Sequence, residues 1–439
     1  MTRKSVWDRG RSRRLAAGML AALSATALSA CGSDQSGGTP QLNWYINNAA
    51  QEPIAQACNE QADGAYQVNI SLLPAAASGQ REQLLRRLAA GDDSVDILSL
   101  DPPFMAEFAN AGFLRPFTDD ETQEFSEGVL KGPLEQSMYE DKMFSAPFYG
   151  NTQLLWYKKS VAEKAGLDLE QPVTWDQVIE AAEKTSTTVA VQGRRNESLM
   201  VWVNALVESA GGRILSEDSQ GASADEVKAD IDSEAGQEAA RIMSTIAESP
   251  VSPPALSTAG EEESRAAFQS DNGGFMVNWP YVWSAFAAAE KDGTLPEDFR
   301  KDVAWARYPR VVEDTPSATP LGGIGISVGA YTAEPEAAVE AIRCLRSAES
   351  QKAYMMSAGD PAAAEEVYED SEIQEQFPMY EAIREGLTDA APRPISAFYG
   401  DVTGAIQQGY HPPRTLSPER TPTATAELLE GVLSNEQLL

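Results

Sequence analysis

From residue 41 onward, short apolar runs alternate with amphipathic helical stretches, and this alternation constrains the fold more than any other feature. Residues 42–47, 66–73 and 95–100 are predicted to be strands, and the segments 53–61 and 79–90 between them helices. Strands joined by crossover helices pair in parallel, with helices on both faces of the sheet. We therefore predict an α/β fold with ligands at the carboxyl ends of strands, where Asn48 and Asp101 follow.

The N-terminus has the three parts of an export signal. Basic residues up to Arg14 precede an uncharged apolar stretch, 15–30, which ends in Leu-Ser-Ala before Cys31. This ending resembles a bacterial lipobox, so residues 1–30 are predicted to be a lipoprotein signal peptide and Cys31 to carry the lipid. A plain secretory signal is the alternative. The Gly- and Ser-rich segment 31–39 is predicted to be a flexible tether.

The charge balance excludes several classes of partner. The chain has 34 Lys and Arg against 66 Asp and Glu, a net charge of −32, so nucleic acid is not an expected partner. An acidic surface is also repelled by anionic lipid, which favours covalent anchoring through Cys31 at the outer face of the cytoplasmic membrane. His411 is the one histidine and lies in a loop-like context, so neither a His-based catalytic site nor a metal site is expected.

Two cysteines, Cys58 and Cys344, remain after Cys31 is assigned. An exported protein reaches an oxidising compartment, so this even number suggests one disulfide, with two buried free thiols as the alternative. A bond between these positions requires that distant parts of the chain share one domain.

Two later segments carry the features of a binding site. A buried strand at 275–277 is followed by Asn278, Trp279 and Pro280, and a Trp in this position is poorly placed for core packing, although a core role is the alternative. A strand at 319–328 is predicted to begin through the pair Gly322-Gly323. Such a pair permits a close approach of the backbone to another group, or simply forms a tight turn.

Several motifs together resemble one known family. The aromatic run 144–159, Thr174-Trp175-Asp176, and the segment 267–280 stand in the order found in extracellular sugar-binding proteins of ABC importers. The resemblance covers residues 40–439 and is closest to the mycobacterial trehalose-binding lipoproteins. Cys58 and Cys344 lie in matching segments, which favours the disulfide, whereas the loop 45–52 departs from the pattern.

The resemblance implies a two-lobe periplasmic-binding-protein fold, with two α/β lobes joined by a hinge of several crossings. One lobe is expected to comprise 40–148 plus 305–350, and the other 149–304 plus 351–439. A sugar, trehalose by the nearest resemblance, is expected between the lobes of a monomeric binding protein. The other implied partners are the ABC permease subunits and their ATPase in the membrane. Neither a cofactor nor enzymatic activity is expected.

Carboxylates, amides and an arginine suit the hydroxyls of a sugar, and aromatic rings suit its C–H faces. The resemblance places sugar contacts at Asp101, Asn151, Glu261, Trp279 and Arg393. Further candidates are Asn48, Gly323 and Tyr281, followed by Tyr399 and Trp44.

Three of these candidates have purely structural alternatives. Asp101 is placed to cap the helix that begins at Pro102, Glu261 to begin a solvated helix, and Arg393 to form a salt bridge.

Alternative functions also follow from the same residues. A maltose or malto-oligosaccharide ligand is the main alternative within the family. Asp101 with Glu261 would also fit the carboxylate pair of a glycoside hydrolase, but the signal sequence and the whole-length resemblance favour transport. A phosphorylated ligand would require more basic residues or a phosphate-binding loop.

Overall fold

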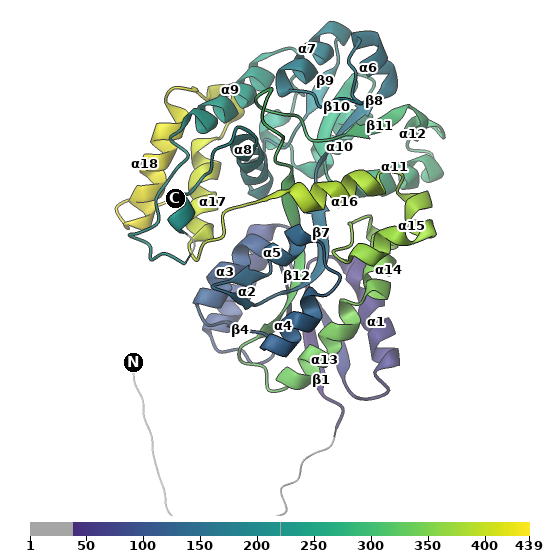
Figure 1. Ribbon diagram of the computed structural model, residues 1–439, viewed down its shortest axis with the longest axis vertical. Coiled ribbons are helices and arrows are strands. Elements are labelled where there is room, and N and C mark those ends of the chain that lie inside the picture. Colours follow the sequence, from purple (N-terminus) through teal and green to yellow (C-terminus); the bar gives the residue numbers. More distant parts are fainter. Residues whose placement is uncertain (1–37, 220) are drawn as a thin grey trace, which may run out of the picture. The chain divides into compact units, whose positions relative to one another are not determined.

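The computed structural model describes residues 38–219 and 221–439 (Figure 1). The predicted signal peptide, the lipid site at Cys31 and most of the predicted tether lie outside these residues. Residues 39–439 form one compact unit.

Two main sheets and one short hairpin make up the β-structure. The strands of the first sheet are β1 (Gln41–Ile46), β2 (Gln67–Leu72), β3 (Ile97–Leu100), β4 (Leu114–Arg115), β7 (Ala146–Thr152), β12 (Pro320–Gly329) and β13 (Ala391–Pro392). The second sheet contains β8 (Leu154–Lys158), β9 (Thr188–Ala190), β10 (Gly273–Asn278) and β11 (Val303–Ala306), and the hairpin contains β5 (Met138–Tyr139) and β6 (Lys142–Met143).

The α-helices are distributed along the whole described chain (Figure 1). They are α1 (Glu52–Gln61), α2 (Ala77–Ala89), α3 (Pro102–Asn110), α4 (Asp119–Ser126), α5 (Lys131–Glu135), α6 (Lys159–Ala165), α7 (Trp175–Thr185), α8 (Glu197–Ser209), α9 (Glu234–Glu248), α10 (Glu261–Gln269), α11 (Tyr281–Asp292), α12 (Phe299–Asp302), α13 (Pro335–Leu345), α14 (Ala348–Ala358), α15 (Ser371–Gln376), α16 (Tyr380–Asp389), α17 (Tyr399–Gly409) and α18 (Thr421–Leu433). Short 3-10 helices are η1 (Ala49–Gln51), η2 (Glu217–Ser219), η3 (Leu256–Thr258), η4 (Glu365–Glu369) and η5 (Pro413–Thr415).

The first sheet has the order β13-β12-β3-β1-β2, and β7 and β4 also pair with β12. Its β1 strand runs parallel to β2 and β3, as the strand–helix alternation predicts, whereas β12 is antiparallel to β3 and β7. Side chains alternate between the two faces of β1. Trp44 packs in one apolar cluster with residues of α1 and α13, and Tyr45 in another with residues of α2 and α3. Helices therefore cover both faces of this sheet.

The second sheet has the order β11-β8-β10-β9 and is mixed, since only β9 and β10 run parallel. The chain passes from the first sheet to the second at Gln153, between β7 and β8, and returns to the first sheet between β11 and β12. This separation into two sheets gives the two-lobe α/β architecture. The finer assignment of 40–148 with 305–350 and of 149–304 with 351–439 to the lobes stays a prediction.

Local sequence signals account for many element boundaries. Thr174 begins α7 with a capping box, because its hydroxyl accepts from the Gln177 N–H while the Gln177 side chain accepts from the Thr174 N–H. Ser233 caps α9, because its hydroxyl accepts from the Gly236 N–H at 3.4 Å. The strand predicted at 319–328 is confirmed as β12, and Gly322 and Gly323 lie inside it, which excludes the alternative of a tight turn at this pair.

A disulfide joins Cys58 of α1 to Cys344 of α13, with 5.8 Å between their Cα atoms. This observation favours the predicted bond over two free thiols. It joins helices that are 286 positions apart in sequence and that cover the same face of the first sheet.

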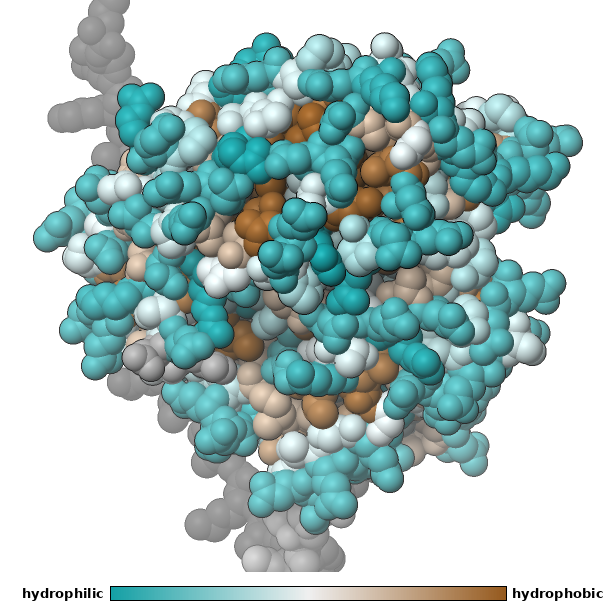
Figure 2. All heavy atoms as spheres, turned by 45° about the horizontal axis from the view of Figure 1, so that its top comes forward, coloured by the Kyte–Doolittle hydropathy of each residue, from teal (hydrophilic) through white to brown (hydrophobic). Residues whose placement is uncertain are grey.

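Hydrophilic residues cover most of the face drawn in Figure 2, with smaller hydrophobic patches between them. In the parts of the chain that the structure describes, we find no helix with the length and apolarity that a membrane crossing requires. The same residues contain no cluster of three or more His, Cys, Asp or Glu side chains suited to a metal ion.

Candidate sugar-binding site

One cavity of about 440 Å³ brings together all eight of the leading candidate residues. They come from both sheets and from the segments that follow their strands. The first sheet contributes Asn48, Asp101, Asn151, Gly323 and, just after β13, Arg393; Glu261, Trp279 and Tyr281 come from the elements around β10. The cavity is thus lined by residues that are far apart in sequence, since Asn48 and Arg393 are separated by 345 positions.

Arg393 lies at the centre of a buried charge cluster. Its Nη2 donates to Asp101 Oδ1 at 2.7 Å, and its Nη1 donates to Glu197 Oε1 at 2.6 Å. Only 5% of the Arg393 side chain is exposed, compared with 17% for Asp101 and 13% for Glu197. Arg393 therefore forms the salt bridge that was its structural alternative, and it still lines the cavity.

The cluster shifts the protonation equilibria of its members. Burial raises the pKa of Asp101 above its ordinary value, although the positive charge of Arg393 opposes this shift. Burial by itself would lower the pKa of Arg393, but the negative charge of Asp101, together with Glu197 and Tyr399, raises it well above the ordinary value. The arginine therefore stays charged at any physiological pH.

Glu197 was not among the candidates predicted from the sequence. It is the first residue of α8, where a carboxylate is ordinarily explained by the helix dipole. Its carboxylate accepts hydrogen bonds from Arg393, from the hydroxyl of Tyr399 and, at 2.8 Å, from Thr403 Oγ1. Those partners lie about two hundred positions away in sequence, so no local pattern could have identified this residue.

Asp101 precedes α3 at the helix N-cap position, as its structural alternative requires, but its side chain does not cap the helix. The carboxylate turns to Arg393 instead, which keeps it at the cavity wall.

Two glutamates at the start of α10 form another part of the wall. Glu261 Oε2 accepts a hydrogen bond of 2.8 Å from Ser198 Oγ, so this side chain is not simply solvated. Glu262, which follows it, accepts from the hydroxyl of Tyr281 and from Arg265. Burial tends to raise the pKa of Glu262, but these two hydrogen bonds lower it overall. Glu262 can therefore accept hydrogen bonds from a ligand in its charged form, beside Glu261 at the cavity wall.

Trp279 directly follows β10 and is partly exposed at the cavity, rather than buried in the core. Gly322 of β12 lies against its ring, because a Cβ at this position would be 3.1 Å from Trp279 Cη2. Gly323 has a different role. Its φ of +127° and a distance of 2.2 Å from a built Cβ to the Tyr149 carbonyl oxygen require glycine for the packing of β12 on β7.

The two asparagine candidates, Asn151 and Asn48, are each fixed by hydrogen bonds within the protein. Asn151 is buried in β7, where its Oδ1 accepts from the Thr152 N–H at 3.1 Å and its Nδ2 donates to Asp360 Oδ1 at 3.2 Å. Asn48 caps η1, since its Oδ1 accepts from the Ala50 N–H at 3.0 Å, and it is exposed at the cavity.

The structure places the two weaker aromatic candidates outside the cavity lining. Trp44 is fully buried under the first sheet, where its Nε1 donates to Ser99 Oγ at 3.0 Å. Its expected sugar contact is therefore wrong, because an inward position on β1 places the ring in the core. Tyr399 is also fully buried and reaches the site only through its bond to Glu197.

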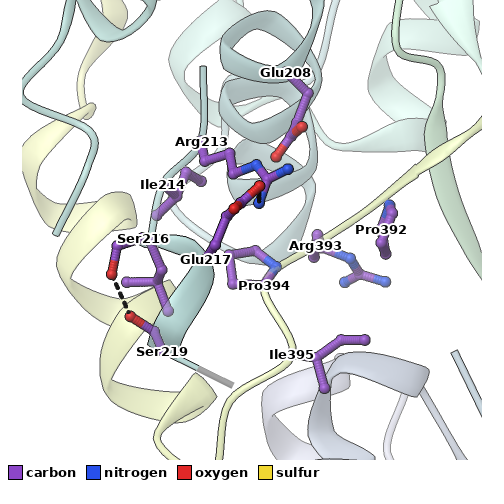
Figure 3. A pocket seen from close by; sticks show the side chains of 11 residues that line it. Glu208, Arg213, Ile214, Ser216, Glu217, Ser219, Pro392, Arg393, Pro394 and Ile395 are labelled. Atoms are coloured by element: carbon purple, nitrogen blue, oxygen red, sulfur yellow. Dashed lines mark hydrogen bonds and ion pairs between the residues drawn. The ribbon is translucent and has the colours of Figure 1, made fainter. Parts of the chain in front are cut away.

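A second cavity, of about 280 Å³, shares Arg393 with the first but contains none of the other leading candidates. Figure 3 shows Arg213 and Glu217 side by side there, with Arg393 extending from the segment that also carries Pro392 and Pro394. Glu208 lines this cavity, and burial raises its pKa to about 7, against the opposing charge of Arg213. This cavity lacks an aromatic side chain in its described lining, so it is a poorer candidate for a sugar.

Comparisons with known proteins identify the family. The model of the bacterial extracellular solute-binding proteins matches residues 43–352. A probable ABC transporter-binding protein of Deinococcus radiodurans is 28% identical over 306 residues, which cover 67% of this chain and 69% of that protein.

Two solved structures have the same fold. The maltose-bound MalE3 of T. maritima is 27% identical with a TM-score of 0.77, and the match covers 89% of this chain and 99% of that one. A tagatose-bound ABC transporter solute-binding protein of Thermotoga lettingae is 22% identical with a TM-score of 0.75, covering 90% and 100%.

These relatives are solute-binding proteins and not enzymes, which confirms the predicted class and removes the glycoside hydrolase alternative. They also confirm the predicted two-lobe fold and an extracellular role. The chain belongs to the bacterial extracellular solute-binding proteins.

Proposed function

We propose that this protein captures a neutral disaccharide, trehalose in the first place, in the 440 Å³ cavity and delivers it to the permease of an ABC importer. The observation that carries the proposal is the convergence of Asp101, Asn151, Glu261, Trp279 and Arg393 on one cavity. A volume in this range suits a small ligand, and the lining combines hydrogen-bonding groups with aromatic rings.

The charges of the cavity support an uncharged, hydroxyl-rich ligand. Asp101, Glu197, Glu261 and Glu262 are its acidic side chains, and Arg393 is the basic one in the described lining. Because Arg393 is already paired with Asp101 and Glu197, it has little capacity left for an anionic ligand. Hydroxyl groups, in contrast, can donate to the carboxylates and accept from the amides.

Trehalose is favoured by the sequence resemblance to mycobacterial trehalose-binding lipoproteins. Maltose is the second candidate, because a structurally similar relative that is 27% identical binds it. The proposed delivery site is the outer face of the cytoplasmic membrane, to which lipid on Cys31 would anchor the protein. The permease subunits and the ATPase are the proposed membrane partners.

Calorimetric titration of the purified protein with trehalose, and then with maltose in the same buffer, tests the proposal. One-to-one binding of trehalose with weak or absent maltose binding is the expected result. Binding of maltose without binding of trehalose would make maltose the proposed ligand in place of trehalose. Binding of neither sugar would contradict the disaccharide proposal. Mass spectrometry of protein from membranes would show whether Cys31 is the lipidated N-terminus.

A further inference from the structure

Asp360 is a carboxylate that touches the candidate site from behind. It lies in the turn after α14 and is not part of the cavity lining. Its Oδ1 accepts from Asn151 Nδ2 at 3.2 Å, and its Oδ2 accepts from the Tyr354 hydroxyl at 3.2 Å. Asp360 therefore contacts a cavity residue without facing the cavity itself.

The turn that carries Asp360 is fixed against β7. The Gly150 N–H donates to the Pro361 carbonyl at 3.1 Å, and Tyr149 forms an antiparallel bridge with Ala362. On the other side of the turn, Gly359 lies so close to α11 that a Cβ there would be 3.0 Å from Tyr281 Cα. The position of the Asp360 carboxylate is thus set by the two elements that carry Asn151 and Tyr281.

The Asn151 amide has one favourable orientation in this setting. Its Oδ1 accepts from the Thr152 N–H while its Nδ2 donates to Asp360. Rotating the amide by half a turn would place its oxygen against the carboxylate and its NH₂ against a backbone N–H, which loses both hydrogen bonds. The orientation of the Asn151 amide at the cavity is therefore determined by Asp360 together with the Thr152 N–H.

We propose that Asp360 is a positioning residue of the ligand site, which orients the Asn151 amide for hydrogen bonding to the sugar. The inference rests on the proposed function for its ligand, but the orientation of Asn151 can be measured without one.

The surroundings of Asp360 make this positioning dependent on pH. Tyr149 of β7 and Tyr354 of α14 are the titratable side chains that face it, and within 38–219 and 221–439 no Lys or Arg forms an ion pair with it. Burial raises the pKa of Asp360 to about 6, although hydrogen bonds from Tyr354 and Asn151 oppose this shift. Below this pH the carboxyl becomes neutral and is a weaker acceptor for Asn151.

Two variants separate positioning from simple structural support. Asp360→Ala removes the acceptor, and we expect trehalose or maltose affinity to fall roughly tenfold at pH 7. Asp360→Asn keeps a neutral acceptor, so it should restore part of the affinity. The Asn variant should melt no lower than the wild type at pH 7, because the substitution removes a buried negative charge that no ion pair neutralises within the described residues. A purely structural residue would lower melting temperature and affinity together.

The pH profile supplies the decisive readout. Wild-type affinity should weaken between pH 7 and pH 5 with a midpoint near 6 and approach that of Asp360→Asn, which should lack this step. Glu208→Gln is the matched control, because burial also raises the pKa of Glu208 to about 7 but this residue lines the other cavity. The Glu208→Gln variant should therefore keep the wild-type fall in affinity near pH 6. An Asp360→Ala variant with wild-type affinity and an unchanged step would overturn the inference.

A ligand-free measurement keeps the inference distinct from the proposed function. The side-chain amide resonance of Asn151, assigned by its loss in Asn151→Ser, should shift with a midpoint near pH 6 and lose this shift in Asp360→Asn. If neither sugar binds but the resonance shifts, the disaccharide proposal fails and the positioning stands. A resonance that does not respond to pH would refute the positioning.

Discussion

Arg393 donates two hydrogen bonds to the carboxylate of Asp101, at 2.7 Å and 3.3 Å, across 292 positions of sequence. The same guanidinium also binds Glu197 at the start of α8. One buried cation therefore joins the end of β3 in the first sheet to the start of α8, a helix that packs against α9 and α17. Its loss should affect stability as well as binding.

Arg393→Met should lower the free energy of unfolding by about 3–5 kcal/mol at pH 7, because it leaves Asp101 and Glu197 buried without a cation. The loss should be smaller at pH 5 than at pH 7, because burial raises the pKa of Asp101 and a protonated carboxyl leaves no buried charge there. Urea denaturation at both pH values measures this. Arg307→Met is the control, because its pair with Asp389 is exposed and should contribute below about 1 kcal/mol. Equal losses in both variants would contradict the prediction.

Trp279→Ala should weaken sugar binding by about 2 kcal/mol, or roughly thirtyfold, because it removes the aromatic face at the cavity. Calorimetry measures the affinity, and thermal denaturation should show a largely intact fold, since the ring is partly exposed. Trp279→Phe should retain part of the binding. An alanine variant that binds the sugar normally would show that the ring is not a contact.

Gly322→Ala should lower affinity several-fold, because the added methyl group would lie 3.1 Å from the Trp279 ring and displace it. A double-mutant cycle with Trp279→Ala tests the cause. When the ring is absent, the Gly322 substitution should have little further effect on affinity. Additive losses would mean that the methyl group acts on something other than Trp279.

The oxidised protein should show no free thiols at Cys58 and Cys344 after unfolding, whereas two titratable thiols would contradict the bond. Reduction should lower the free energy of unfolding by about 2–5 kcal/mol, since the bond closes a long loop. Sugar affinity below the melting transition should change little, because neither cysteine lines the cavity. Melting curves and calorimetry with and without reductant measure the two effects.

Glu208→Gln should raise the melting temperature at pH 8 by on the order of a few degrees and have less effect at pH 5. Burial raises the pKa of Glu208 in the folded protein to about 7, above its ordinary value of 4.5. The stability associated with its neutral form is therefore present below pH 4.5 and lost as the pH rises through 7. Melting curves at the two pH values measure the direction of the change in melting temperature. A variant that melts at a lower temperature than the wild type at pH 8 would contradict the prediction.

The parts of the fold and site that the sequence predicts are those with local signals. Strand–helix alternation predicted the parallel core of the first sheet, in which β1 pairs with β2 and β3. The position of Trp279 after a buried strand and before a proline indicated that its ring is not in the core.

Long-range contacts set the remaining features, and these could not be predicted locally. The indole ring of Trp44 would suit a sugar contact, yet the position of Trp44 on β1 points this ring into the core. Glu197 looks like an ordinary first-turn glutamate until Arg393, Tyr399 and Thr403 come together around it. Asp360 acquires its contact with Asn151 only through the pairing of its turn with β7.

The place of β12 in the first sheet sets an order of events during synthesis. β1, β2, β3 and β7 are made early, but β12 is the strand that pairs with both β3 and β7. The edges of β3 and β7 that β12 covers stay without this partner until residues 320–329 have been made. A chain of this topology thus depends on keeping its first strands from pairing with other chains before synthesis reaches β12.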